Sequence, residues 1–263
     1  MELPTTTALD LELAEGWLTV WMNEPEIRNA LTAARGNDLR AVCAALQDRR
    51  DIRGVTFRGR GGQFCAGGDL RAFREVFQGG ARRDDVVALS MGAADLFDAI
   101  NALPQVTIMA VEGAAMAGGF GLVCVGDVVI AEAGAKFALT ETQIGLVPAQ
   151  IAPFVLQRLG AREGRRLMLT AAKLDAAAAQ AVGLVDEVTT DMDAVLAAME
   201  MQVKRAGPNA VALTKSLILT LPALDRADQA ALAAERFADA MLSDEGREGV
   251  MSFAQKRKPG WAE

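Results

Sequence analysis

The sequence predicts an α/β fold in which helices pack outside sheets, followed by a region made of helices alone. Two observations support this prediction. Segments with the two-residue periodicity of strands alternate with segments of helical periodicity up to about residue 190. From about residue 191 the strand patterns stop, and apolar residues recur at helical spacing. We therefore divide the chain into a core, residues 1–190, and a C-terminal helical region, residues 191–263.

The first predicted element is a β-hairpin. Every second residue is apolar on both sides of an Ala-Glu-Gly turn, at Leu9, Leu11, Leu13, Leu18, Val20 and Met22. An amphipathic helix follows, because apolar residues recur there with the i, i+3, i+4, i+7 spacing, at Leu39, Val42, Cys43 and Leu46. Residues 55–57 then form a short strand that leads into the glycine-rich loop GRGGQFCAGGDL.

A second helix is predicted over residues 86–103, which carry an apolar stripe and end before Pro104. A strand over residues 105–111 follows and enters a second glycine-rich stretch, EGAAMAGGFG. A short helix and a strand over residues 127–131 come next. The alternation of strands and helices is typical of an α/β core.

Four helices are predicted in the C-terminal region, over residues 191–205, 208–220, 225–242 and 245–257. Leucine, methionine, alanine and phenylalanine cover broad faces of these helices. Such faces are stable when they pack on the core or are buried between subunits. We expect both.

Composition excludes several classes of function. The net charge of −7 argues against general nucleic-acid binding, which needs a clustered positive surface. No apolar run approaches the ~20 residues of a membrane span. The start of the chain, MELPTTTALDLELAEG, resembles neither a signal peptide nor a transit peptide, so a cytoplasmic location is expected.

The chain contains no histidine and no tyrosine. This excludes a Ser-His-Asp or Cys-His mechanism and a histidine-ligated metal site. The cysteines Cys43, Cys65 and Cys124 form no CxxC pair and are interpreted as small buried apolar residues, so no metal site is expected. Acid–base chemistry must therefore come from carboxylates, lysines or cysteines, assisted by backbone dipoles.

The two glycine-rich loops, GGQFCAGGDL and EGAAMAGGFG, each follow a strand and precede a helix. Such corners present unpaired N–H groups at the positive end of a helix dipole, and small residues let a ligand approach the backbone. Two corners brought together form an oxyanion hole, in which each donor contributes ~3–4 kcal/mol to stabilising a developing negative charge. The alternative is that the glycines only permit tight turns. A dinucleotide loop is excluded because GxGxxG is incomplete, and a phosphate loop because GK[ST] is absent.

Carboxylates near these loops are candidate acids or bases. Glu141 ends the short run 136–139, where it faces either a cleft or solvent. Glu112 is interpreted as a solvated turn residue, and Asp127 as the start of a strand or the partner of an arginine.

The motifs QFCAGGDL, VEGAAMAGGFGLVCVGDVVIA, KFALTETQIGLVPAQIAPF and MSFAQKRKPGW resemble the crotonase, or enoyl-CoA hydratase/isomerase, superfamily. The likeness covers nearly the whole chain. It implies a spiral of β-β-α units and a helical end that forms trimers or dimers of trimers. It also implies an acyl-CoA thioester as substrate and no separate cofactor, because coenzyme A is part of that substrate.

The resemblance assigns roles to single residues. The backbone N–H groups of Ala66 and Gly118 hold the thioester oxygen, and residues 66–69 (Ala66, Gly67, Gly68 and Asp69) line the thioester and adenine side. Phe253 and Lys256 match the positions from which a neighbouring subunit contacts the nucleotide of coenzyme A. Glu141 matches one of the two glutamates that hydratases of this family commonly use.

The sequence departs from the family pattern at Gly121, where the other glutamate is common. Three interpretations follow. The protein is a hydratase that uses Glu141 alone or with help from the substrate, as in the branch acting on 3-substituted glutaconyl thioesters such as isohexenylglutaconyl-CoA. Alternatively, it is a Δ3,Δ2-enoyl-CoA isomerase in which Glu141 is the single proton shuttle. The third interpretation is a non-catalytic acyl-CoA-binding protein that keeps the fold.

Overall fold

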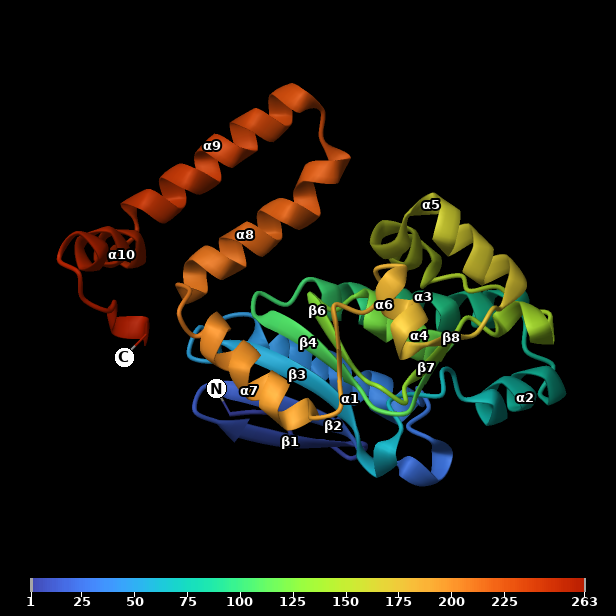
Figure 1. The fold of residues 1–263 in the computed structure, drawn as a ribbon. Helices are drawn as coiled ribbons and strands as arrows, with labels where there is room; N and C mark the ends of the chain where they lie inside the picture. The colour runs from blue at the N-terminus through green and yellow to red at the C-terminus, as the bar shows by residue number, and fades with distance from the viewer. Residues whose placement is uncertain (1, 263) are drawn as a thin grey trace.

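The computed structural model describes residues 2–262, with the backbone alone at residues 75 and 77. Figure 1 shows a core of sheets and helices from which a helical arm projects. The larger sheet has six strands in the order β1-β2-β3-β4-β6-β9. Its strands are β1 (Leu9–Ala14), β2 (Trp17–Met22), β3 (Gly54–Gly59), β4 (Val106–Val111), β6 (Val128–Glu132) and β9 (Glu187–Thr189).

Pairing within the larger sheet is antiparallel between β1 and β2, which form the predicted hairpin, and parallel between all the other neighbours. A second sheet contains the short strands β5 (Ala114–Met116), β7 (Lys136–Ala138) and β8 (Leu174–Asp175). The pairs β4/β5 and β6/β7 each give one strand to each sheet. This stepwise passage between sheets agrees with the spiral of β-β-α units that the resemblance implied.

Six helices of the core lie between strands. The first five are α1 (Ala33–Leu46), α2 (Leu70–Gln78), α3 (Arg83–Asn101), α4 (Gly118–Cys124) and α5 (Ala152–Thr170). A short helix, α6 (Ala176–Ala181), connects β8 to β9. Single 3-10 turns complete the chain at η1 (Pro25–Ile27), η2 (Arg60–Gly62), η3 (Glu141–Ile144), η4 (Leu221–Ala223) and η5 (Gly260–Ala262).

Strand β4 explains how the core is layered. Side chains of a strand point alternately to opposite faces of its sheet, and here both faces are covered. Met109 and Val111 join the main core, whereas Ile108 and Ala110 pack against the C-terminal helix α7 (Met192–Val203). The continuous apolar run of this strand is therefore required by burial on both faces.

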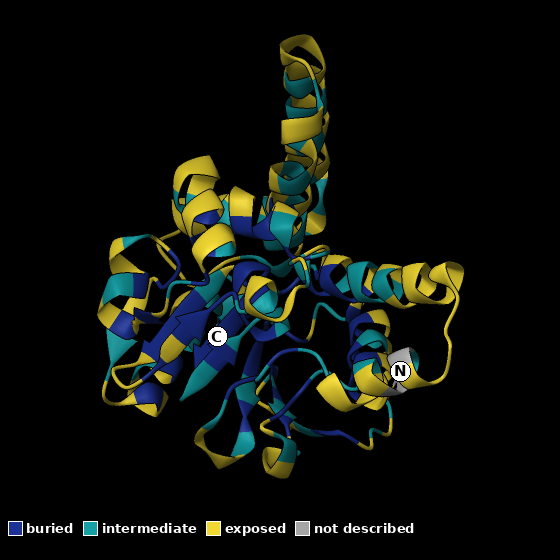
Figure 2. Cartoon of the chain, turned by 90° about the vertical axis from the view of Figure 1, so that its right-hand side faces the viewer, coloured by how far each residue is buried: buried dark blue, intermediate teal, exposed yellow. Residues whose placement is uncertain are grey.

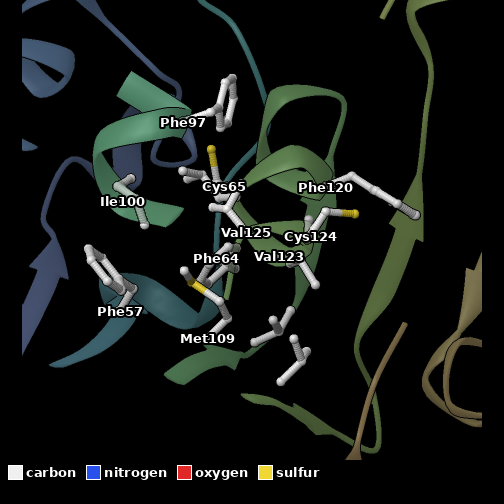
Figure 3. Close-up of a cluster of buried hydrophobic side chains, with 14 of the residues drawn as sticks. Phe57, Phe64, Cys65, Phe97, Ile100, Met109, Phe120, Val123, Cys124 and Val125 are labelled. Atoms are coloured by element: carbon white, nitrogen blue, oxygen red, sulfur yellow. The ribbon is translucent and has the colours of Figure 1, made fainter. Parts of the chain in front are cut away.

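The main core gathers around α4. Figure 3 shows aromatic and aliphatic side chains from β3, α3, β4 and α4 in one cluster, among them Phe57, Phe97, Met109 and Phe120. These four side chains are almost completely buried. The tight cluster fixes the position of α4, and with it the start of this helix.

Beyond α7 the chain forms the arm, which consists of α8 (Pro208–Thr220), α9 (Arg226–Leu242) and α10 (Asp244–Ala254). Figure 1 shows α8 and α9 side by side and directed away from the sheets, and Figure 2 shows that most of the arm is exposed or half-buried. The four predicted C-terminal helices are thus confirmed. Helix α7 packs its apolar face on the sheet, through Met192 and Leu196.

The arm is joined to the core by an ion pair between a buried lysine and a partly exposed aspartate. Lys215 of α8 lies 2.6 Å from the Asp127 carboxylate and also donates to the carbonyl oxygen of Gln105. The same carboxylate oxygen accepts hydrogen bonds from the amide and the hydroxyl of Thr107. The sequence offered two interpretations of Asp127. It directly precedes β6, in agreement with the first, and its partner is a lysine from a distant helix and not the arginine of the second.

We expect Lys215→Ala to destabilise the protein by about 1.5–3 kcal/mol, because it removes a charge-assisted hydrogen bond from the partly exposed Asp127 carboxylate. Urea unfolding measures this loss. Lys204→Ala is the control, since Lys204 only makes long ion pairs at the surface and its loss should cost less than about 1 kcal/mol. Equal losses in the two variants would contradict the anchoring role of Lys215.

Candidate functional site

The two glycine-rich corners meet through their backbones. The amide of Cys65, in the loop after β3, donates to the Ala114 carbonyl at 2.9 Å. The amide of Met116 donates back to the Cys65 carbonyl, also at 2.9 Å. The loop therefore adds a short strand-like contact to β5, and this contact places the loop against the start of α4.

Glycine is required where the corners touch. A methyl group placed on Gly119 would lie 2.3 Å from the Cys65 carbonyl oxygen. Gly67 has φ of +95°, and a methyl group placed there would lie 2.8 Å from the Met116 carbonyl oxygen. Any larger residue would force the two loops apart. The sequence left open that these glycines only permit tight turns. That alternative does not explain their positions, because they also permit a close contact between two segments that are distant in the sequence.

Two amides at this contact are left without a partner. Among hydrogen bonds between described residues, neither the Gly68 N–H nor the Gly118 N–H donates to another group. A methyl group placed on Gly118 would lie 3.7 Å from the Gly68 nitrogen, so the two amides are neighbours. The expected pairing of Ala66 with Gly118 is therefore wrong. The Ala66 N–H already donates to the Arg28 carbonyl at 3.0 Å and is not available to a ligand.

The residue before Gly118 has a strained backbone. Ala117 has φ of 48° and ψ of −117°, a conformation that residues with a side chain rarely adopt. Its amide donates to the Ala138 carbonyl of β7 at 2.9 Å, which holds it in place. This sharp turn from β5 directly into α4 is what leaves the Gly118 amide at the helix start without a partner.

The other end of the first loop begins α2. The Asp69 carboxylate accepts a hydrogen bond from the Arg71 amide at 2.9 Å, which is a helix-capping contact. The aromatic ring of Phe73 lies next to Gly68, because a methyl group placed on that glycine would be 3.0 Å from the ring. The predicted residues 66–69 thus have different roles. Gly67 permits the close approach to the Met116 carbonyl, Gly68 has an N–H group without a partner, and Asp69 caps the start of α2.

Glu141 lies at the same edge of the small sheet as Gly118. Strands β5 and β7 are parallel, and Met116 is opposite Ala138 in their register. The chain therefore leaves both strands on one side, toward Gly118 in one case and toward Glu141 in the other. The sequence-based placement of Glu141 at a strand end is confirmed.

The Glu141 carboxylate is poorly solvated. Its Oε2 atom is buried and has no hydrogen-bond partner among the described residues. Burial raises the pKa of this carboxyl above its usual value, and a backbone hydrogen bond only partly opposes the effect. A carboxyl with a raised pKa and a free oxygen, close to unpartnered amides, is typical of an acid or base in a reaction site.

Apolar side chains occupy the space beside Gly121. A methyl group placed on this glycine would lie 2.2 Å from the Ile151 Cγ2 atom and 3.2 Å from the ring of Phe97. Phe97 also packs against Phe154, with their ring centroids 6.1 Å apart. The position where the resemblance would place a second glutamate is thus covered by an apolar wall of Phe97, Ile151 and Phe154.

The other carboxylates near the corners are engaged elsewhere. Glu112, which the sequence suggested to be solvated, is half-buried and forms an ion pair with Arg58 at 2.8 Å. Asp127 holds Lys215. Of the three acidic residues considered from sequence around the second corner, Glu141 is the one whose carboxylate is free to react.

Within residues 2–262, neither the cysteines nor the potential metal ligands are arranged for a reaction site. All three cysteines are free and buried, and burial raises the pKa of Cys65 to about 11. No group of His, Cys, Asp and Glu residues in the described chain is arranged to hold a metal ion. No helix in the same range is long and apolar enough to cross a membrane.

Phe253 and Lys256 do not join the site within one chain. Phe253 lies in the last turn of α10 and Lys256 lies just beyond the helix, and Figure 1 shows this helix far from α4. The Phe253 side chain is 86% exposed. A role for these residues at a reaction site therefore requires a second copy of the chain.

Comparisons with known proteins cover the core and the arm alike. A family model described as enoyl-CoA hydratase/isomerase matches residues 12–263. A putative enoyl-CoA hydratase of Thermus thermophilus is 33% identical over 244 residues, which are 91% of this chain and 95% of the relative. The structure of AtuE from Pseudomonas aeruginosa is 42% identical, with a TM-score of 0.94 over 98% of this chain and 100% of that chain. An enoyl-CoA hydratase/isomerase from Marinobacter aquaeolei is 37% identical, with a TM-score of 0.93 over 97% and 99% of the two chains.

The raised pKa of Glu141 predicts how stability depends on pH. The folded state holds this proton more tightly than the unfolded state, whose carboxyl has the ordinary pKa of 4.5. Below both pKa values the group contributes nothing, and as the pH rises through them the folded state loses stability. We expect Glu141→Gln to be more stable than the wild type at about pH 8 and equal to it near pH 4. Urea unfolding across this range tests the expectation, and a difference independent of pH would contradict it.

Proposed function

The chain belongs to the enoyl-CoA hydratase/isomerase family, and we propose that it hydrates a 2-enoyl-CoA thioester with Glu141 as its single acid–base group. Membership of the family makes it an enzyme that acts on an acyl-CoA. The observation that carries the proposal is the free, buried Oε2 of Glu141 at the sheet edge that also ends in the unpartnered Gly118 amide.

The amides of Gly68 and Gly118 would hold the thioester oxygen. Hydration places negative charge on this oxygen when an oxygen nucleophile adds to the β-carbon. Two fixed N–H groups stabilise that charge without reorganisation, and each contributes about 3–4 kcal/mol to lowering the barrier. Gly68 takes the place of Ala66 in this proposal, because the Ala66 amide is already bonded to Arg28.

Glu141 would move one proton in each half of the reaction. Its carboxylate takes a proton from water as the water oxygen bonds to the β-carbon, and the thioester becomes an enolate. The same carboxyl then gives this proton to the α-carbon, so that water is added across the double bond and the carboxylate is regenerated. The raised pKa of Glu141 favours the first transfer, because it brings the group closer to the operating pH.

The substrate we propose is a branched, 3-substituted glutaconyl-CoA such as isohexenylglutaconyl-CoA. The support is the resemblance of FCAGGD, GGFGL and LVPAQIAPFVLQRLG to that branch of the family. Such a substrate brings its own carboxylate to a site where Gly121 supplies none. A simple 2-enoyl-CoA lacks this group and should react more slowly.

Isomerisation of a 3-enoyl-CoA is the second candidate, and the apolar wall beside Gly121 favours it. Moving a proton from the α-carbon to the γ-carbon needs one carboxylate and no water. An apolar surface that excludes water suits that step. A non-catalytic acyl-CoA-binding protein is the third, and it would bind thioesters without converting any of them.

We also propose that the C-terminal region, residues 191–263, forms a trimer or a dimer of trimers. The arm exposes large apolar side chains that one chain leaves uncovered: Ile218, Phe237, Met241, Leu242, Val250, Met251 and Phe253. In such an assembly Phe253 and Lys256 would approach the nucleotide of an acyl-CoA bound by a neighbour. Sedimentation equilibrium tests this, and a monomer at micromolar concentration would contradict it.

A product assay in water enriched in heavy oxygen separates the three candidates. The enzyme is incubated separately with a 2-enoyl-CoA, a 3-enoyl-CoA and a 3-methylglutaconyl-type CoA, and the masses of the products are measured by mass spectrometry. We expect heavy oxygen to be incorporated fastest with the glutaconyl thioester. A shifted double bond without the label indicates an isomerase, and binding without conversion indicates a binding protein.

We expect Glu141→Gln to lower kcat by about 10²–10⁴-fold and to leave binding of the acyl-CoA nearly unchanged, because the amide cannot take or give a proton. Steady-state kinetics and calorimetric binding measure the two effects. Glu163→Gln is the matched control, since Glu163 lies on α5 and pairs with Arg166 on the outside of the helix. A Glu141→Gln variant with near-normal kcat would show that the carboxyl does no chemistry.

A further inference from the structure

A buried arginine lies behind the first glycine-rich corner. Arg35, in the first turn of α1, has no solvent-exposed surface. Its guanidinium donates to the Ala30 carbonyl and, at 2.7 Å, to the Glu24 carboxylate. Neither the oxyanion donors nor the proton transfer described above uses this residue.

Arg35 fixes the segment 24–32, which runs from the end of the hairpin to α1. One of its terminal nitrogens bonds the beginning of this segment and the other bonds near its end. Within the segment, Asn29 is completely buried, and its side chain accepts from the Glu24 amide and donates to the Arg60 and Gln63 carbonyls. The segment is therefore held at both ends and in the middle.

The same segment carries the loop that offers the Gly68 amide. The Ala66 N–H donates to the Arg28 carbonyl at 3.0 Å, and the Leu31 N–H donates to the Gly67 carbonyl at 2.7 Å. Leu31 also pairs with Gly68 as an isolated parallel bridge. The peptide between Gly67 and Gly68 is thus bonded through its oxygen to segment 24–32. Since a peptide is planar, fixing its oxygen fixes the direction of the Gly68 N–H.

The burial of Arg35 carries a large desolvation cost. The Arg35 Nε atom is buried and has no partner among the described residues. Burying a guanidinium costs several kcal/mol that one carboxylate and one carbonyl only partly offset. Apolar residues that replace a buried ion pair often leave a protein as stable as before. A buried ion pair is therefore weak evidence for a stabilising role, and the contact of Arg35 with the segment that orients the Gly68 amide points to a role in function.

We propose that Arg35 is a positioning residue for the oxyanion hole, acting through segment 24–32 to aim the Gly68 N–H at the thioester oxygen. The inference rests on the proposed function, because it requires a substrate oxygen at Gly68 and Gly118. Arg35 itself touches neither substrate nor Glu141. Its effect is on the stabilisation of the charged oxygen and not on the affinity for coenzyme A.

The test uses the double variant Glu24→Gln, Arg35→Met, which removes both charges and leaves no lone buried ion. A displacement of about 1 Å in a reacting group costs about 100-fold in rate, so we expect kcat to fall by about 10- to 100-fold. KM for the thioester and the urea midpoint should stay close to the wild-type values. The single variant Arg35→Lys keeps the charge but cannot bond Glu24 and Ala30 with the fixed spacing of a guanidinium. Its kcat should therefore also fall below that of the wild type.

A spectroscopic readout reports on the oxyanion donors without turnover. The probe is a cinnamoyl-CoA with a para-dimethylamino group, whose absorption moves to longer wavelength when its carbonyl is polarised. We expect a clear shift with the wild type and a smaller one with both Arg35 variants, at similar affinity. Arg158→Met is the matched control, because Arg158 also joins a carboxylate to backbone carbonyls, at Asp186, Leu184 and Gly126. It should keep the full shift and the full kcat even if it lowers stability.

The results separate the role of Arg35 from the existence of the oxyanion hole. A wild type that binds the probe without any shift contradicts the oxyanion hole and the role of Arg35 together. A shift in the wild type that is unchanged in the double variant contradicts the role of Arg35 alone. So does full activity in Arg35→Lys, which would mean that the charge and not the geometry matters. A loss of kcat that only follows a loss of folded protein would assign Arg35 to stability.

Discussion

The contact between the two glycine-rich corners is the constraint on which the rest of the site depends. It consists of two backbone hydrogen bonds between Cys65 and the strand β5, and it connects the loop after the large sheet to the small sheet. Gly67 and Gly119 permit this approach, since a methyl group on either would collide with a carbonyl oxygen. Because the contact fixes where α4 begins, it also fixes the Gly118 amide and its distance from Gly68.

The site concentrates conformations and charges that are individually unfavourable. Ala117 has a strained backbone, the Glu141 carboxylate has a buried oxygen without a partner, and Arg35 is an ion inside the protein. Each costs of the order of 1–3 kcal/mol or more and persists only where the surroundings determine it fully. The apolar cluster around α4 in Figure 3 provides this support, because it holds the helix on which the second corner ends. The well-packed cluster and the strained second corner are therefore adjacent in the structure, and the corner keeps its conformation because the cluster holds α4.

Periodicity predicted the elements that are long enough to show it. The hairpin, the helices α1 and α3, the strand β4 and the four C-terminal helices all follow from apolar spacing. Strands β5, β8 and β9 contain two or three residues, which is too short for any repeat to be visible. The sequence therefore indicated an α/β core without revealing that it has a second sheet.

The site residues were predictable as residue types but not as contacts. Glycine and alanine at two corners indicated free amides, and Glu141 indicated a carboxylate at a strand end. The amide that is actually free depends on Arg28, whose carbonyl comes from a segment 38 positions away from Ala66 and takes up the Ala66 N–H. The partner of Asp127 is 88 positions away in α8. Contacts of this kind are set by tertiary packing, and local sequence patterns carry no signal for them.

The apolar wall beside Gly121 changes what the absence of a second glutamate means. Ile151 fills the space that a side chain at position 121 would need, and Phe97 closes it from α3. A glutamate introduced at that position alone could not reach the place it has in two-glutamate relatives, because it would have to displace Ile151 first. The absence of a side chain at position 121 is thus matched by contacts from three segments and is not an isolated difference at one residue. The same contacts leave no room for a polar side chain at position 121, so this position offers neither a proton donor nor a proton acceptor.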